Sequence, residues 1–282
     1  MIKLDSSLPH IMTKFELGVE ITPIQRKFLK TYGFLHFKNV ASRDEVGAII
    51  SDLDTMEETW MCEGRTEING IPLFMGETED GKPYVQRFAF TTLYSEAIRT
   101  LVRDSRFEPI RTLVDEGARI GERENDGVVV NRYVNRKKSI YNRLGWHTDG
   151  LRDVFKGRMP QEMLNVGLHL DDCDAINGGL RLIPGTHLQG FWGLCFRKAH
   201  FIGHRPDPDE ICIETEAGDL TIHDGRLWHR VARSHYTGEQ SIRRSMFMPY
   251  ISGPVEEKDE SSRTPPYHAL GEVIRRMKVR IL

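Results

Sequence analysis

The sequence predicts a mainly β protein, an antiparallel sandwich or barrel with helices packed against it. Two observations support this fold class. From about Val128 onwards, short runs rich in β-branched and aromatic residues alternate with turn sequences, whereas the chain before that point follows helical patterns. With 282 residues, of which 39% are hydrophobic, the chain is long enough to bury a large core as one domain.

Residues 1–127 are expected to form a mainly helical part that packs on the core. Thr22 followed by Pro23 is a typical helix start, and this helix should continue to Tyr32. The segment Phe34–Phe37 is a short strand candidate. The sequence Ser42-x-x-Glu45 is a capping box that opens a second helix.

The core is expected over 128–251, followed by a tail over 252–282 with a last helix at Tyr267–Leu282. We treat the whole chain, 1–282, as a single domain. Turn sequences such as Asn177-Gly178-Gly179 separate the core strands. The predicted core strands are Val128–Val134, Leu164–Leu170, Leu180–Ile183, Ile211–Thr215, Leu220–His223 and Ser245–Tyr250.

Composition excludes several classes of partner. The net charge of −2 provides no overall field that would attract nucleic acid or an anionic membrane. The sequence has neither a signal-peptide pattern nor an apolar run near the ~20 residues of a membrane span. The four cysteines form no C-x-x-C pair, which is typical of reduced thiols. We therefore expect a cytoplasmic protein without nucleic-acid or membrane partners.

The first chemical signal is the pattern His-x-Asp, which occurs at His147-Thr148-Asp149 and at His169-Leu170-Asp171. Residues two apart on a strand point to the same face, so such a pair can bind one metal ion. A further histidine from another strand would complete the two-histidine, one-carboxylate set that suits non-heme Fe(II). Because the residue frequencies alone produce such matches by chance, the pattern by itself is weak. His147 follows an irregular polar stretch, as a site at a barrel mouth would.

The order of the remaining motifs adds specificity. Tyr32-Gly33-Phe34-Leu35 precedes the His-x-Asp pair, and Asn177-Gly178-Gly179, Pro184-Gly185-Thr186-His187, Gly218–His229 and Arg243-Arg244-Ser245 follow it. On these residues the chain resembles the phytanoyl-CoA dioxygenase family of Fe(II)/2-oxoglutarate oxygenases. The resemblance implies a double-stranded β-helix core, also called a jelly roll or cupin-like fold, with N-terminal helices and a C-terminal helix.

The resemblance also assigns roles to individual residues. It makes His147, Asp149 and His229 the iron ligands and leaves His169 and His187 outside the ligand set. It implies that Arg243 binds the far carboxylate of the cosubstrate 2-oxoglutarate, with Arg244 as the alternative. A guanidinium suits this role because it forms two parallel hydrogen bonds to a carboxylate. Asn131 and Asn165 are further candidates for contact with the cosubstrate.

The activity implied by the resemblance is oxidation of an unactivated C–H group with O₂, releasing succinate and CO₂. Because a carboxylate stands at Asp149, where halogenating relatives have a small residue, the expected outcome is hydroxylation, desaturation or ring closure. Two alternatives use the same triad. One is a metal-binding cupin-like protein without oxygenase activity, and the other is a Zn(II) or Mn(II) metalloenzyme.

The substrate is expected to be a small molecule. The segment between Asn131 and Arg158 contains eight basic and two acidic residues, so its net charge is +6 whereas that of the whole chain is −2. A positive site mouth would favour an anionic substrate, with Arg152 and Arg132 as contact candidates. The alternative is a solvated loop. Likewise, the segment 191–209 is either a lid or a surface excursion. The oligomeric state stays open.

Overall fold

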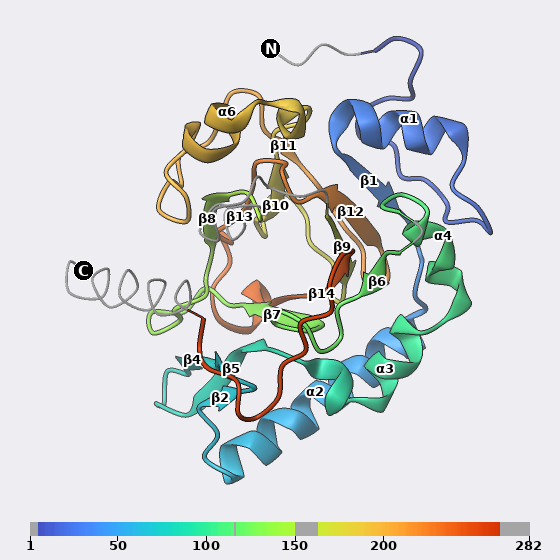
Figure 1. Ribbon diagram of the computed structural model, residues 1–282. Coiled ribbons are helices and arrows are strands. Elements are labelled where there is room, and N and C mark those ends of the chain that lie inside the picture. The colour runs from blue at the N-terminus through green and yellow to red at the C-terminus, as the bar shows by residue number, and fades with distance from the viewer. Residues whose placement is uncertain (1–4, 116, 150–162, 266–282) are drawn as a thin grey trace.

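Two antiparallel sheets face each other and confirm the jelly-roll prediction (Figure 1). The computed structural model describes residues 5–115, 117–149 and 163–265. The C-terminal helix expected at 267–282 and the substrate candidate Arg152 lie outside these residues.

The larger sheet has eight strands. Its spatial order is β1 (Phe34–Phe37), β12 (Leu220–Asp224), β9 (Leu164–His169), β14 (Arg243–Ile251), β7 (Val129–Tyr133), β5 (Pro83–Phe88) and β4 (Phe74–Glu77), with β6 (Arg119–Ile120) paired to β14. The smaller sheet has four strands, in the order β11 (Ile211–Cys212), β10 (Gly179–Leu182), β13 (His229–Ala232) and β8 (Leu144–His147). A separate ribbon pairs β2 (Glu67–Ile68) with β3 (Ile71–Pro72).

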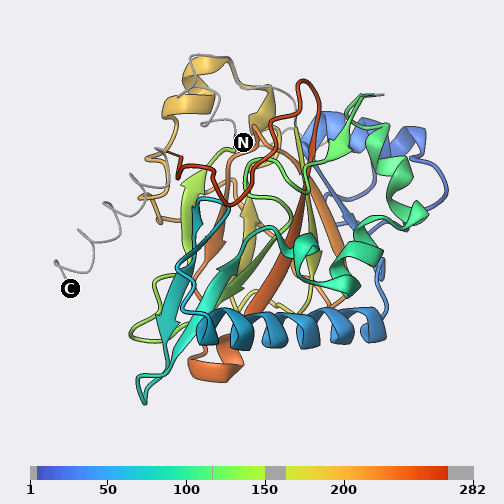
Figure 2. The same ribbon diagram turned by 60° about the horizontal axis from the view of Figure 1, so that its bottom comes forward.

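Helices cover the outside of the larger sheet, and α2 lies across its strands in Figure 2. The helices near the larger sheet are α1 (Pro23–Tyr32), α2 (Arg43–Cys62), α3 (Glu96–Val102) and α4 (Glu108–Arg111). Helix α6 (Phe191–Phe196) lies instead beside the smaller sheet (Figure 1). Short 3₁₀ turns occur at Thr91–Leu93, Ser105–Phe107, Thr186–Leu188 and Gly238–Ser241. None of the helices in the described part of the chain combines the length and the apolarity that a membrane crossing requires.

Both predicted helix starts are confirmed by their caps. The Thr22 hydroxyl accepts from the Gln25 backbone N–H, and the Gln25 side chain bonds back to Thr22. Ser42 and Glu45 form the same reciprocal pair at α2. Each pair provides acceptors for two backbone N–H groups that have no partner within the helix at its first turn.

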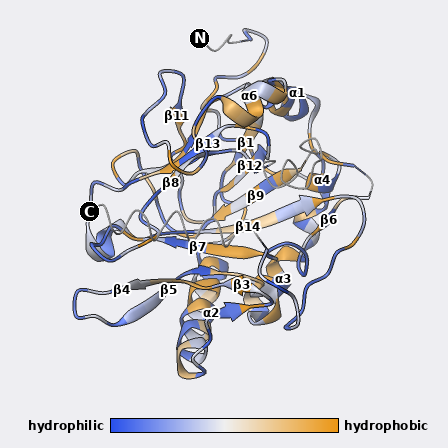
Figure 3. Ribbon diagram, turned by 60° about the vertical axis from the view of Figure 1, so that its left-hand side comes forward, coloured by the Kyte–Doolittle hydropathy of each residue, from blue (hydrophilic) through white to orange (hydrophobic). Residues whose placement is uncertain are grey.

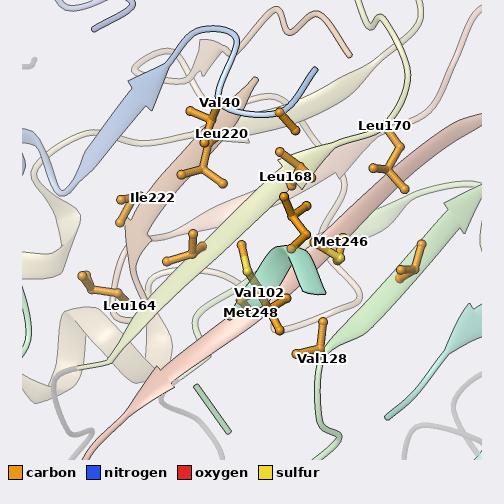
Figure 4. Close-up of a cluster of buried hydrophobic side chains, with 14 of the residues drawn as sticks. Val40, Val102, Val128, Leu164, Leu168, Leu170, Leu220, Ile222, Met246 and Met248 are labelled. Atoms are coloured by element: carbon orange, nitrogen blue, oxygen red, sulfur yellow. The ribbon is translucent and has the colours of Figure 1, made fainter. Parts of the chain in front are cut away.

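The two faces of the larger sheet differ in chemistry. Leu164, Val166 and Leu168 of β9 point outward into the main hydrophobic core, which also includes residues of the helices. Figure 4 shows this packing, with Val102 of α3 close to Met248 of β14. The alternate residues of β9 point between the two sheets, because successive strand side chains face opposite ways. The inner face is therefore where polar side chains are held.

Hydropathy along the ribbon fits this arrangement. In Figure 3 the hydrophobic colour concentrates on strands of the larger sheet such as β7, while the loops at the edge are hydrophilic. The strands predicted at 128–134, 164–170, 180–183, 220–223 and 245–250 are present with shifts of one or two residues at most ends. The strand predicted at 211–215 shortens to β11, Ile211–Cys212.

One expectation about the core needs correction. The larger sheet does not begin at residue 128, because β1, β4 and β5 from the N-terminal part extend it on both sides. The β4–β5 hairpin was not predicted. Its strands are short, β5 begins at Pro83, and an edge hairpin of this kind has too little alternation to be distinguished from a loop.

Candidate metal centre and cosubstrate pocket

His147, Asp149 and His229 come together at one end of the smaller sheet. His147 ends β8 and lies directly opposite His229, which begins β13. Asp149 follows His147 by two residues. One potential ligand atom from each of the three residues lies within 4.8 Å of the others, and the described residues contain no other such group of three. The fold thus joins the residues that the sequence suggested as metal ligands.

Backbone carbonyls orient both imidazole rings. The Nδ1 of His147 lies 2.9 Å from the carbonyl oxygen of Gly145, and the Nδ1 of His229 lies 2.9 Å from that of Leu227. A carbonyl only accepts, so each Nδ1 carries the proton and donates it, which leaves the Nε2 lone pair facing the centre. Burial lowers the pKa of both histidines, so both are neutral at physiological pH, the form that binds metal.

Asp149 supplies the carboxylate. Its Oδ1 lies 3.9 Å from the Nε2 of His147, and its Oδ2 lies 3.8 Å from the Nε2 of His229. The amide nitrogen of Asn165 donates to Oδ2 over 2.6 Å. Burial by itself would raise the pKa of Asp149, but the surrounding imidazoles, His229 first, hold that pKa well below its ordinary value. Two neutral imidazoles and one ionised carboxylate are a donor set that fits Fe(II) and leaves positions open.

His169 and His187 lie outside this group, as the family resemblance implied. The Nε2 of His169 lies 3.0 Å from the Thr221 hydroxyl, further along the interior of the larger sheet. The Nε2 of His187 donates to the backbone carbonyl of Lys30 over 3.1 Å. Both rings therefore have structural partners.

Arg243 lies inside the protein, between the two sheets. It is 4% exposed, and its Nη1 and Nη2 donate to the carbonyls of Ala232 and Asn142 over 2.7 and 3.1 Å. Its Nε has no hydrogen-bond partner among the described residues, and its guanidinium lies over the Tyr133 ring. It lines a cavity that Tyr133, Val231 and Phe247 also line. A buried guanidinium with spare N–H groups in a cavity fits a carboxylate ligand.

The neighbouring Arg244 is occupied elsewhere. Its Nε and Nη2 donate to the two carboxylate oxygens of Asp171 over 2.9 and 2.7 Å. Asn131, in contrast, is buried on the inner face, and its Oδ1 has no partner within the described residues. Asn165, the other proposed cosubstrate contact, is engaged with Asp149.

The structure does not support Arg132 as a substrate contact. Its guanidinium donates to Glu57 of α2 over 2.8 Å and lies over the Phe88 ring, so it faces the helices and not the triad. Arg136 and Lys138 of the same positive segment also pair with carboxylates, those of Glu239 and Glu77. A count of charged residues in the sequence overestimated the unpaired positive charge of this segment, because such a count does not show which side chains form ion pairs.

Two residues near the triad were missed by the sequence reasoning. Phe201 stacks on the ligand candidate His147 with ring centroids 4.8 Å apart, so this residue of the segment 191–209 lies against the site. His223 of β12 is 1% exposed, and its Nε2 lies 3.7 Å from the Oδ2 of Asp149. His223 could have been found from the sequence, because it lies two residues after Thr221 on the predicted strand Leu220–His223 and therefore shares the face of Thr221.

Comparisons with known proteins agree with this fold. The profile of the family described as phytanoyl-CoA dioxygenase (PhyH) matches residues 29–244. Among solved structures, AviO1 from Streptomyces viridochromogenes Tue57 is 18% identical, with 82% of this chain and 96% of that chain covered and a TM-score of 0.58.

Two further solved structures are similar at the level of fold. Iron-bound HygX from Streptomyces hygroscopicus is 16% identical over 82% of this chain and 86% of that one, with a TM-score of 0.58. The non-heme alpha-ketoglutarate-dependent carbocyclase SnoK from nogalamycin biosynthesis is 19% identical over 90% of each chain, with a TM-score of 0.57. No curated protein matches by sequence.

Proposed function

Because the chain belongs to the phytanoyl-CoA dioxygenase family, we propose that it is an Fe(II)/2-oxoglutarate-dependent oxygenase acting on a C–H group of a small molecule. One observation carries the proposal. The His147, Asp149 and His229 group and the buried guanidinium of Arg243 both belong to the interior between the two sheets. A metal site and a carboxylate site in one interior suit a metal-chelating dicarboxylate.

In this proposal O₂ would be the oxidant at the bound metal: 2-oxoglutarate would supply two electrons by its conversion to succinate and CO₂, and the C–H substrate would supply the other two. The protein supplies the positions. His147, Asp149 and His229 would hold the metal, and Arg243 would bind the far carboxylate of 2-oxoglutarate. Asn131 would donate to the cosubstrate through its amide. Burial of His147, His229, Arg243 and Asn131 keeps water from competing for the hydrogen bonds.

The reaction outcome is proposed as hydroxylation, desaturation or ring closure. The presence of Asp149 supports this set, since the carboxylate occupies the place that a halide would need. Relatives of the same fold include an enzyme named as an epimerase and one named as a carbocyclase, so fold alone does not select among outcomes.

The decisive experiment is anaerobic addition of Fe(II) and 2-oxoglutarate to the purified protein. Chelation is expected to produce a visible charge-transfer band, which His147→Ala and Asp149→Ala should abolish. His187→Gln is the control, because His187 lies outside the ligand group and should retain the band. A wild-type protein without the band, or a band unchanged in both alanine variants, would exclude the proposed function.

The substrate is proposed to be a small anionic molecule, on the basis of the basic residues around Arg152. A panel of compounds scored by succinate formation should identify it, with carboxylates, phosphates and phosphonates included. For an anionic substrate, turnover should fall with ionic strength and on Arg152→Ala. Turnover that responds to neither change would argue for a neutral substrate.

A further inference from the structure

We propose that His223 is a positioning residue that, together with Asn165, holds the Oδ2 of Asp149 so that Asp149 binds the metal through Oδ1 alone. The inference rests on the proposed function, because it concerns the same metal site. It assigns a role to a histidine that lies outside the ligand group.

The first observation is that His223 is buried without a partner. It is 1% exposed, and neither ring nitrogen has a hydrogen bond to any of the described residues. Buried polar groups are paired in the great majority of native proteins, so His223 is expected to have a partner in the working protein. His169, a buried histidine on the neighbouring strand, is different because its ring already meets Thr221.

The His223 ring lies beside two of the proposed metal ligands. The Nε2 of His223 is 3.7 Å from the Oδ2 of Asp149, just beyond hydrogen-bond distance, and its ring centroid is 4.5 Å from that of His229. A shift of under 1 Å by either side chain would form the bond, given a usual N–H···O distance of about 2.9 Å.

Side chains from two neighbouring strands lie beside the same oxygen, the Oδ2 of Asp149. His223 of β12 is directly opposite Asn165 of β9, and the Asn165 amide already donates to Oδ2 over 2.6 Å. A carboxylate oxygen has two lone-pair directions. With Asn165 on one and His223 on the other, Oδ2 has none left for the metal. Oδ1 lies 3.9 Å from the Nε2 of His147, as Oδ2 lies 3.8 Å from the Nε2 of His229, and with both lone pairs of Oδ2 occupied Oδ1 remains as the metal-binding oxygen.

The number of Asp149 oxygens that bind the metal determines how many coordination positions stay open. A metal held by two imidazoles and one carboxylate oxygen would keep one more position open than a metal held through both oxygens of the carboxylate. That additional position would remain free when 2-oxoglutarate binds. His223 would therefore maintain the open position on which the proposed reaction depends.

The test compares His223→Phe with His223→Gln, using Co(II) as the metal and 2-oxoglutarate as the cosubstrate. Binding of each is measured by titration, and the cobalt absorption spectrum reports coordination. In His223→Phe, which keeps a flat ring at this position and removes the donor, we expect Co(II) and then 2-oxoglutarate to bind about 10–100-fold more weakly, with an altered cobalt spectrum. In His223→Gln, whose amide can donate to Oδ2, we expect most of the binding to return.

His36→Gln is the matched control. His36 is a buried histidine of β1 whose Nε2 lies 2.9 Å from Asp219, so its loss should lower stability without changing cobalt coordination. Wild-type binding and spectrum in His223→Phe would overturn the role of His223, as would equal losses in His223→Gln or in His36→Gln. Failure of the wild-type protein itself to bind Co(II) at the triad would instead exclude the proposed function.

Discussion

Arg243 and Arg244 are adjacent on β14 but lie in opposite environments. Arg243 is buried between the sheets and donates to two backbone carbonyls, while Arg244 is paired with both oxygens of Asp171. Strand alternation requires that only one of two neighbouring side chains faces inward. The structure decides which one it is, and so makes Arg243 the candidate for cosubstrate binding.

Replacing these two arginines should therefore have separable effects. Arg243→Gln should raise the KM for 2-oxoglutarate at least about 30-fold, because a buried charged partner of a carboxylate is worth about 2 kcal/mol or more. Arg244→Gln should leave that KM within about twofold and lower the free energy of unfolding by about 1 kcal/mol, as expected for a partly exposed ion pair. Steady-state kinetics and urea unfolding of both variants test this. The reverse pattern would identify Arg244 as the anchor.

Gly33 should tolerate no side chain. Its φ is +82°, and an added Cβ would lie 2.4 Å from the His187 ring and 2.8 Å from the Leu227 side chain. Its carbonyl also accepts from Asp224 at the end of β12, beside the site. Gly33→Ala is expected to cost about 2–4 kcal/mol of unfolding free energy through backbone strain and the clash.

Gly47→Ala is the control, because it should change the free energy of unfolding in the opposite direction. Gly47 lies in the exposed interior of α2, where an added Cβ meets nothing within 4 Å. Gly47→Ala should therefore stabilise the protein by about 0.5–1 kcal/mol. Urea unfolding curves of both variants give the comparison, and similar values for the two would contradict the assignment of strain to Gly33.

Gln86 should be essential for the loop that leads into β8. It is fully buried; its amide nitrogen donates to Ser139 over 2.7 Å, and its amide oxygen accepts from the backbone N–H groups of Ile140 and Tyr141. Gln86→Leu fills the space but leaves these backbone groups unpaired, which should cost about 2–4 kcal/mol. Gln86→Glu retains the two acceptor bonds but places a buried carboxylate oxygen against the Tyr141 carbonyl, which now accepts from the amide, so it should be destabilising as well. An unfolding free energy of Gln86→Leu equal to that of the wild-type protein would indicate that packing, not hydrogen bonding, holds this loop.

The metal-free protein should lose stability in acid through its buried histidines. Burial lowers the pKa of His169 to about 3 from an ordinary value of 6.5. Because the folded-state pKa is the lower one, the unfolded chain binds the proton first as the pH falls below 6.5. The contribution of His169 is therefore complete above pH 6.5 and is lost progressively toward pH 3.

His169→Gln isolates that contribution. The loss for one such group has a slope of up to about 1.4 kcal/mol per pH unit. The unfolding free energy of the wild-type protein, measured between pH 5 and pH 8, should fall more steeply below pH 6.5 than that of His169→Gln. Parallel curves would show that His169 keeps an ordinary pKa in the folded protein.

Much of the fold and part of the site were predictable because local chemistry determines them. The caps at Thr22 and Ser42, the glycine turns and most core strands depend on a few neighbouring residues. The His-x-Asp pair was also visible, since its two members share a strand end. Arg132 shows the limit of this approach, because its charge was evident but its pairing with Glu57, 75 residues away, was not.

Local patterns in the chain indicate a mainly β protein with a His-x-Asp pair and an ordered series of family motifs. Which side chains meet depends on the folded arrangement. It placed His229 opposite His147, turned Arg243 inward and Arg244 outward, and brought His223 to Asp149. Strand register and sheet packing depend on contacts between distant segments, and a one-residue shift would reverse every one of these orientations.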